Sequence, residues 1–157
     1  MRVLTPTEIR YLIRVIPLRS PFGVRDRAML ILLLHTGLRV SEVCGLRVFD
    51  VVQWGAPRKM LDLPACLGKG GQARLIPLNT TARKMISLLL RFNLARGFSI
   101  APEAPLLTNR CGKPLSVRTF QHLVQRYREA AELSSRITPH AFRHTMAVAV
   151  NEKCPAP

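Results

Sequence analysis

The stretch MLDLPACLGKGGQARLIPL, residues 60–78, decides the fold class. Apolar side chains recur at every second position in residues 60–63 and again in residues 74–78, and the glycine-rich segment 68–71 (GKGG) lies between them. A period of two on both sides of a glycine turn predicts two antiparallel strands. We therefore expect one β-hairpin that carries Lys69 at its tip.

The rest of the chain shows the spacing of helices, with apolar residues three and four positions apart. Capping residues, prolines and helix-ending glycines mark where these helices begin and end. The expected helices run from Thr5 or Thr7 to Pro17, from about Val24 to Gly37, from Val40 to Gly45, from Thr80 or Thr81 to about Arg96, from Ser116 through Ala131, and onward from Thr138-Pro139. The predicted fold class is thus α+β, mainly α-helical with a small antiparallel β-hairpin.

Charge is the first indication of function. The 157 residues include 24 Lys and Arg against 9 Asp and Glu, which gives a formal net charge of +15 at pH 7. Residues 51–100 are the most cationic part, with eight basic residues and one acidic residue. Because 48% of the chain is hydrophobic, it can bury a core and is no disordered basic tail. A folded protein of this charge is expected to bind a polyanion, and we favour nucleic acid.

Membrane insertion is not expected. The longest unbroken apolar run, residues 28–34, is far shorter than the roughly 20 residues that cross a bilayer. No charged stretch faces an aromatic or leucine-rich side in the way of a membrane-surface helix. We expect a cytoplasmic, nucleoid-associated protein that has no membrane partner.

Residues 35–42, HTGLRVSE, contain the first candidate site. Arg39 follows the helix-ending Gly37 and precedes a new helix, so its guanidinium can point into a cleft. Glu42, one turn later, can hold that guanidinium in orientation. The alternative is an ordinary Arg–Glu pair on the surface. Lys69 is a further candidate, because the backbone of its glycine turn can come close to a polyanion; the alternative for it is a solvent-exposed hairpin lysine.

Residues 138–145, TPHAFRHT, contain the second. With Thr138 as the cap, His140 and Arg143 share a face at a helix N-terminus, which favours anions through its free amides and its dipole. This arrangement predicts a phosphate pocket, although His140 could equally be a half-buried cap residue and Arg143 one more surface charge.

Metal binding is rejected at this helix. His140 and His144 are four residues apart, but Ala141 occupies the glutamate position of an H-E-x-x-H motif and no nearby acid or cysteine completes a ligand set. The four cysteines, which show no C-x-x-C spacing, are expected to be reduced and buried or half-buried: Cys44, Cys66, Cys111 and Cys154.

Together, the segments TGLRVSE, GKG followed by RLIPL, and TPHAFRHT resemble the catalytic domain of the tyrosine recombinases, the family of phage integrases and bacterial Xer proteins. Residues 106–116, LLTNRCGKPLS, are similar to the strand and turn that this family has before its next helix. The resemblance runs from about Leu4 to Val150.

The resemblance implies that one DNA strand is cleaved by a tyrosine, held as a 3′-phosphotyrosyl link and rejoined to another strand, without metal or nucleotide cofactor. Arg39 and Arg143 match the two arginines that clamp the non-bridging phosphate oxygens. Lys69 matches the general acid for the leaving 5′ oxygen, and His140 matches the histidine that manages the tyrosine proton. The expected partners are double-stranded DNA and other recombinase protomers. Supporting roles are expected of Glu42 and His144. DNA contacts are expected of Lys69, Arg74, Arg110 and Lys113.

The nucleophile departs from the family pattern. In the family it follows H-x-x-R at some distance, whereas fourteen residues follow Arg143 and none is a tyrosine. Of the two tyrosines present, Tyr127 falls on an apolar helix stripe and favours a core role, and Tyr11 lies in the first helix, where the family has no nucleophile. We expect residues 1–150 to be a catalytic domain without its last helices, residues 151–157 to be a tail foreign to the family, and the chain to be inactive alone.

Two other functions fit parts of the pattern. A DNA-binding remnant or regulator of recombination would keep the cationic surface without catalysis. A basic ribosomal or nucleoid protein would explain the charge equally well, but it gives no reason for three ordered motifs.

Overall fold

The structure is a computed structural model, and it describes residues 4–67, 73–134, 137–139, 141–142 and 145. Within these residues the chain forms helices and short antiparallel strands, as the α+β prediction requires. In chain order the elements are α1 (Pro6–Arg14), α2 (Pro21–Thr36), α3 (Val40–Cys44), α4 (Val48–Val51), β1 (Val52–Gln53), β2 (Ala56–Pro57), β3 (Met60–Leu63), β4 (Arg74–Pro77), α5 (Thr80–Ala95) and α6 (Val117–Ala130).

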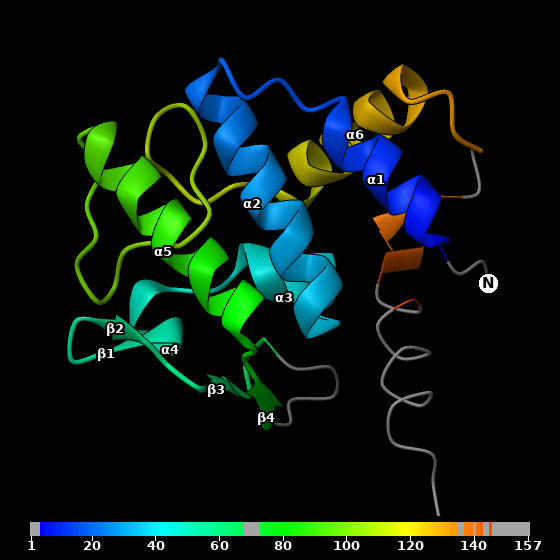
Figure 1. Cartoon of the computed structure of the whole chain (residues 1–157). Helices are drawn as coiled ribbons and strands as arrows, with labels where there is room; N and C mark the ends of the chain where they lie inside the picture. Colours follow the sequence, from blue (N-terminus) through cyan, green and yellow to red (C-terminus); the bar gives the residue numbers. More distant parts are fainter. Residues whose placement is uncertain (1–3, 68–72, 135–136, 140, 143–144, 146–157) are drawn as a thin grey trace, which may run out of the picture.

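The centre of the fold is the packing of α2 against α5, which lie side by side (Figure 1). Met29 and Leu33 of α2 and Ile86 and Leu89 of α5 are almost completely buried. Burial of a large apolar side chain stabilises a fold by roughly 1.5–3 kcal/mol. The packed helices α2 and α5 therefore form the scaffold that positions the segment following each of them.

The predicted hairpin is present at one edge of this scaffold. Strands β3 and β4 pair antiparallel, with Met60 opposite Pro77 and Leu63 opposite Arg74. Along β3 the side chains alternate between exposed and buried, because one face of the hairpin packs on the core. The predicted tip, which includes Lys69, lies outside the described residues.

A second, smaller hairpin was not predicted. Strands β1 and β2 pair with Val52 opposite Pro57, and Trp54 and Gly55 form the two-residue turn between them. Both turn residues have positive φ, 52° for Trp54 and 76° for Gly55. A side chain other than glycine in this left-handed region costs about 1 kcal/mol. Asn-Gly is the usual sequence of such a turn, and this turn has Trp-Gly instead, so the sequence does not predict it.

Helix ends agree with the prediction in most places, but α1 ends at Arg14 rather than at Pro17, the short helix α4 was not predicted, and the starts of α2 and α5 differ. Thr5 caps α1 and Ser116 caps α6, each through a side-chain oxygen that accepts a backbone N–H. Helix α2 begins at Pro21, three residues before the expected start, because proline suits the first helical position. Asn79, rather than Thr80 or Thr81, caps α5, and its Oδ1 accepts the Ala82 N–H at 2.8 Å.

The expected last helix is described in part. Pro139, Ala141, Phe142 and Thr145 are helical, and Phe142 is completely buried. The Leu4 N–H donates to Thr145 Oγ1 at 2.9 Å. This hydrogen bond joins the first residue that the structure describes to the last one.

Tyr127 has the core role that its stripe predicts. It is 4% exposed, and its hydroxyl donates a short hydrogen bond to Asp26, which also accepts from the Arg25 guanidinium. Arg25 Nη1 in turn donates to the Thr108 carbonyl at 3.0 Å. Burial, reinforced by the Asp26 carboxylate, raises the pKa of Tyr127 to about 12. This buried network ties α6 to α2 and to the loop before α6.

The expectation for the cysteines is only partly confirmed. Cys44 is buried, and burial raises its pKa to about 12. Cys66 and Cys111 are exposed, which corrects the prediction, because both lie in loops rather than on a packed face. Cys154 lies outside the described residues. Among the described residues we find no helix that is long and apolar enough to span a membrane.

Candidate phosphate-binding site

The end of α2 positions the first candidate residue. Gly37 closes α2 in the left-handed conformation, with φ of 68°, and its N–H donates to the Leu33 carbonyl. The chain turns sharply at Gly37. The side chain of Leu38 is buried and holds the backbone before Arg39 in place. Arg39 then adopts extended backbone angles as the N-cap of α3. The sequence signal of a helix-ending glycine before a new helix is thus confirmed.

Glu42 is the centre of the site. It is completely buried, and its Oε2 accepts the backbone N–H of Arg39 at 2.8 Å. Arg39 Nη1 donates to Glu42 Oε1 at 2.8 Å, so the expected contact between these side chains is present. Arg74 Nη2 donates to Glu42 Oε2, also at 2.8 Å. One buried carboxylate therefore holds two guanidinium groups that come from α3 and β4.

The electrostatics keep Glu42 ionised. Burial alone would raise its pKa, but the Arg39 N–H and the guanidinium groups of Arg39 and Arg74 outweigh this effect, so the pKa lies below its ordinary value. A charged carboxylate at neutral pH fixes both arginine side chains in place. The group of three carries a net charge of +1.

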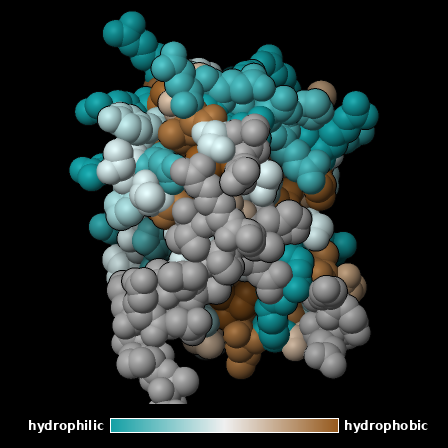
Figure 2. All heavy atoms as spheres, turned by 90° about the vertical axis from the view of Figure 1, so that its right-hand side faces the viewer, coloured by the Kyte–Doolittle hydropathy of each residue, from teal (hydrophilic) through white to brown (hydrophobic). Residues whose placement is uncertain are grey.

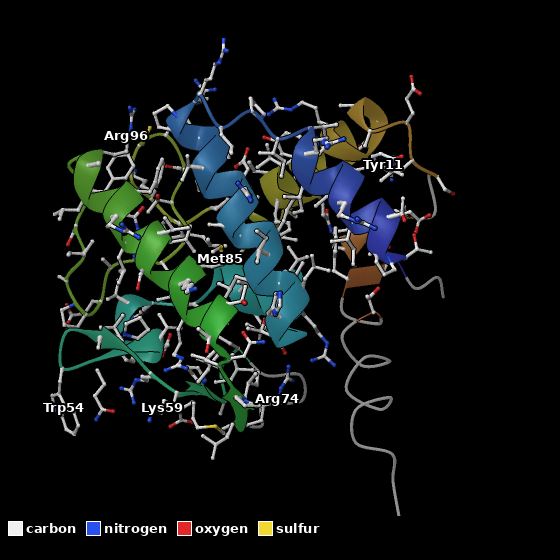
Figure 3. The ribbon with its side chains drawn as sticks, in the orientation of Figure 1. Tyr11, Trp54, Lys59, Arg74, Met85 and Arg96 are labelled. Atoms are coloured by element: carbon white, nitrogen blue, oxygen red, sulfur yellow. The ribbon has the colours of Figure 1, made fainter. Side chains whose placement is uncertain are left out.

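The two arginines retain exposed surface for a ligand. Their side chains are 25% and 34% exposed for Arg39 and Arg74, whereas the Glu42 side chain is fully covered. Each guanidinium carries five N–H donors, and the bonds to Glu42 use one terminal nitrogen of each. The remaining donors of two such forks match the oxygens of a phosphate. This arrangement can bind a phosphodiester at the edge where Arg74 lies (Figure 3).

Arg74 has a role that the sequence analysis missed. We expected it to contact DNA, but not to share Glu42 with Arg39. Arg74 and Glu42 are 32 positions apart in the sequence, and Arg74 meets Glu42 only because β4 returns along β3. No local pattern reports such a contact.

Four predicted site residues lie outside the described residues: Lys69, His140, Arg143 and His144. Arg39 is therefore the one member of the expected catalytic set that the structure describes. The strands on both sides of Lys69 are described, as are the buried neighbours Ala141 and Phe142 of the last helix.

Arg110 and Lys113, the other predicted DNA contacts, do not join this group. Arg110 lies over the Phe22 ring, 5.0 Å from its centroid, and Phe22 is in the first turn of α2. Lys113 belongs to the same turn, where its carbonyl accepts the Asn109 N–H. A helix of 16 residues such as α2 is about 24 Å long, and Arg39 follows its other end.

The two tyrosines lie in different surroundings. Tyr127 is buried and its hydroxyl donates to Asp26, so it is not accessible to a phosphate. Tyr11 is 50% exposed on α1, at a groove of about 1300 Å³ between α1 and α2 that also contains Ile13 and Leu34. Figure 2, which views the side of the molecule where α1 lies, shows hydrophobic atoms at the surface between hydrophilic ones.

Metal ligands do not converge in the described part of the chain. No three His, Cys, Asp or Glu residues come together there in a way that could hold an ion. The candidate site is cationic, with a single carboxylate that already accepts three hydrogen bonds.

A model of the phage integrase family matches residues 2–155 of this chain. Among curated relatives, the tyrosine recombinase XerC of Roseiflexus castenholzii is 39% identical over 156 residues, which cover 94% of this chain and 46% of the relative. The tyrosine recombinase XerD of Halalkalibacterium halodurans is 30% identical over 146 residues, which cover 93% and 47%. The chain spans about half the length of the curated relatives it matches.

Solved structures share the fold. The XerA recombinase superposes with a TM-score of 0.76 at 22% identity, over 99% of this chain and 53% of that one. The catalytic core of lambda integrase gives 0.71 at 22% identity, over 98% and 85%. The Tn1549 transposon integrase, solved in complex with circular intermediate DNA, gives 0.77 at 21% identity, over 99% and 54%.

Proposed function

The chain belongs to the phage integrase family, and from that premise we propose that it acts in site-specific DNA recombination as the catalytic-domain portion of a tyrosine recombinase. Its substrate is the phosphodiester backbone of double-stranded DNA. The reaction is cleavage and rejoining of a strand through a 3′-phosphotyrosyl link, and other recombinase protomers are its partners.

One observation carries this proposal: the buried Glu42 carboxylate holds the guanidinium groups of Arg39 and Arg74 next to each other with exposed donors. When an oxygen nucleophile attacks phosphorus, negative charge grows on the non-bridging oxygens. Donors that are already oriented stabilise that charge more than they stabilise the ground state, and this difference lowers the barrier. Arg39 acts in this way on the scissile phosphate, together with Arg143, and Arg74 binds beside it.

The proton transfers are assigned to the residues that match the family motif. The attacking tyrosine oxygen forms a bond to phosphorus and passes its proton to His140. The bond between phosphorus and the 5′ oxygen breaks, and Lys69 donates a proton to that leaving oxygen. His144 and Glu42 support these groups, and Glu42 does so by orienting Arg39.

The nucleophile in this proposal is neither Tyr11 nor Tyr127. Residues 1–157 alone therefore form no covalent link with DNA, and cleavage needs a tyrosine from a polypeptide segment outside them. The cationic site is expected to be competent when that tyrosine is supplied.

A suicide substrate tests the proposal. A nicked duplex that traps the phosphotyrosyl link is mixed with the chain and a separate family segment that carries the tyrosine, and covalent adduct is measured on a denaturing gel. Removing one preorganised donor typically costs roughly 100-fold or more in rate, so Arg39→Ala should abolish most adduct, whereas Arg39→Lys should retain part of it. Adduct at the unchanged rate in Arg39→Ala would place the phosphate elsewhere.

A second function is favoured by the exposed guanidinium groups of Arg39 and Arg74, which can hold DNA whether or not a strand is cleaved. DNA binding without cleavage, as in a regulator of recombination, needs only the cationic surface. It shares with the first function a steep loss of affinity as salt rises, because bound counterions are released. The two differ in the trans assay: strong DNA binding with no adduct at any concentration of the tyrosine segment supports the regulator.

A further inference from the structure

Trp54 is the only tryptophan of the chain and the most exposed of its large hydrophobic residues in the part that the structure describes. Its exposure is 94%, against 65% for Leu75 and 61% for Leu94. It forms the tip of the hairpin of β1 and β2, and it points away from the body of the molecule (Figure 3). An indole that is almost fully in water contributes no packing to the fold.

The backbone at Trp54 also disfavours this residue. The turn needs positive φ at both of its central positions, which Asn-Gly supplies with least strain. Trp54, with φ of 52°, supplies neither a favourable conformation nor a buried contact. Fold stability therefore does not account for a tryptophan here, and an external contact is the remaining physical role.

The surroundings of Trp54 are cationic. Arg58 and Lys59 follow β2 directly, and Lys59 precedes β3, which pairs with the strand that carries Arg74. Trp54, Lys59 and Arg74 follow one edge of the molecule (Figure 3). The Arg58 backbone N–H donates to the Val51 carbonyl at 2.7 Å. This hydrogen bond fixes the segment that follows β2 to the end of α4. The aromatic tip thus extends the edge that holds the candidate phosphate site.

We propose that Trp54 contacts the same double-stranded DNA whose phosphate binds at Arg39 and Arg74, with its indole against the sugar–phosphate backbone of the flanking duplex. This inference rests on the proposed function. Trp54 is nine positions before Leu63, which lies opposite Arg74. At no more than 3.6 Å per position plus one strand spacing, Trp54 lies within about 37 Å of Arg74. That distance corresponds to roughly eleven base pairs of duplex.

The chemistry of the side chain suits this contact. A rigid aromatic ring loses little conformational freedom on binding, and its apolar face can pack against the deoxyribose sugars of a duplex of any sequence. The neighbouring cations, Arg58 and Lys59, neutralise the phosphates on either side. Trp54 therefore adds sequence-independent affinity and fixes where the hairpin meets the flanking DNA.

Intrinsic fluorescence tests the inference directly, because Trp54 is the only tryptophan. The full chain is titrated at low salt with duplexes that extend from 5 to about 20 base pairs beyond a central site. We expect quenched emission and a several-fold loss of acrylamide access once the flank is long enough to reach the hairpin. Unchanged acrylamide access in the complex with the longest duplex would overturn the proposal.

The variant Trp54→Asn separates binding from folding. It introduces the residue that the turn prefers, so its thermal midpoint should equal or exceed that of the unmodified chain. Its affinity for the long duplex should fall by roughly fivefold, with the salt dependence unchanged because no charge is removed. Leu94→Asn, near the end of α5, is the matched control and should bind as the unmodified chain does.

The remaining outcomes distinguish the failures. If Trp54→Asn binds normally while Arg74→Ala binds weakly, the tryptophan proposal is wrong and the proposed function stands. If protection of the indole grows with protein concentration in the absence of DNA, Trp54 contacts a second copy of the chain and the DNA contact is wrong. If the unmodified chain binds no duplex even at low salt, the proposed function itself fails.

Discussion

The chain contains the same local motif twice, and the two copies differ in the bonds that their acidic residue makes. Arg39-Val40-Ser41-Glu42 and Arg47-Val48-Phe49-Asp50 each begin a short helix with an arginine, and in each the acidic residue accepts the backbone N–H of that arginine at 2.8 Å. The acidic residues are 0% and 5% exposed. The pKa of Glu42 is lowered, whereas the pKa of Asp50 is raised.

The cause of the difference is the number of guanidinium groups on each carboxylate. Burial and the negative charge of Asp62 raise the pKa of Asp50, and the N–H of Arg47 and the charges of Arg47 and Arg58 do not compensate. Glu42 is also buried, but it bonds directly to Arg39 and Arg74. A capped helix start is therefore a structural device at both places. It becomes a candidate anion site only where a second arginine arrives from a distant strand.

Substitution of the two acids should give the largest contrast. Glu42→Gln leaves two neighbouring guanidinium groups without their carboxylate, and we expect the free energy of unfolding to fall by about 2–4 kcal/mol. Asp50→Asn keeps an acceptor for the Arg47 N–H and removes a carboxylate that burial disfavours, so the change should stay below about 1 kcal/mol. Urea denaturation at pH 7 measures both. Equal losses would mean that the arginine pair does not distinguish the sites.

Substitution of the two capping arginines should separate the sites in DNA binding. Arg39→Ala removes exposed donors beside Arg74, and we expect affinity for duplex DNA to fall by about tenfold, with the salt slope reduced by about one. Arg47→Ala should change affinity by less than about twofold. Fluorescence anisotropy of a labelled duplex at several salt concentrations measures both values. A larger effect of Arg47→Ala would move the phosphate site to α4.

The smallest contrast is in how the free energy of unfolding depends on pH in the acid range. The sign of this dependence differs between Glu42 and Asp50. The stability that Glu42 contributes is complete above its ordinary pKa of 4.5 and is lost as the pH falls toward its lower value in the folded state. For Asp50 the raised pKa favours the protonated form, so its contribution is present below 3.8 and is lost as the pH rises.

Chemical denaturation between about pH 3 and pH 6 tests this sign. Glu42→Gln should flatten the rise of stability with pH, and Asp50→Asn should make that rise steeper. Parallel curves for the two variants would show that the guanidinium bonds do not control the titration.

Much of the fold follows from local residues. Gly37 ends α2, Ser116 begins α6, and the alternation in β3 marks a half-buried strand, so these boundaries are visible in the sequence. The hairpin at Trp54 was missed because its strands have two residues each and its turn lacks the expected Asn-Gly. Asn79 was passed over as a cap because two threonines follow it.

The sequence by itself determined the starts of α1, α3 and α6, the hairpin of β3 and β4 and the placement of Arg39 beside Glu42, because capping, turns and neighbouring charges act over short distances along the chain. Only the tertiary structure decided that Arg74 reaches Glu42 while Arg110 lies against Phe22, about a helix length away. The reason is that packing of α2 on α5 and pairing of β3 with β4 set those distances, and neither leaves a trace in the residues beside Arg74 or Arg110.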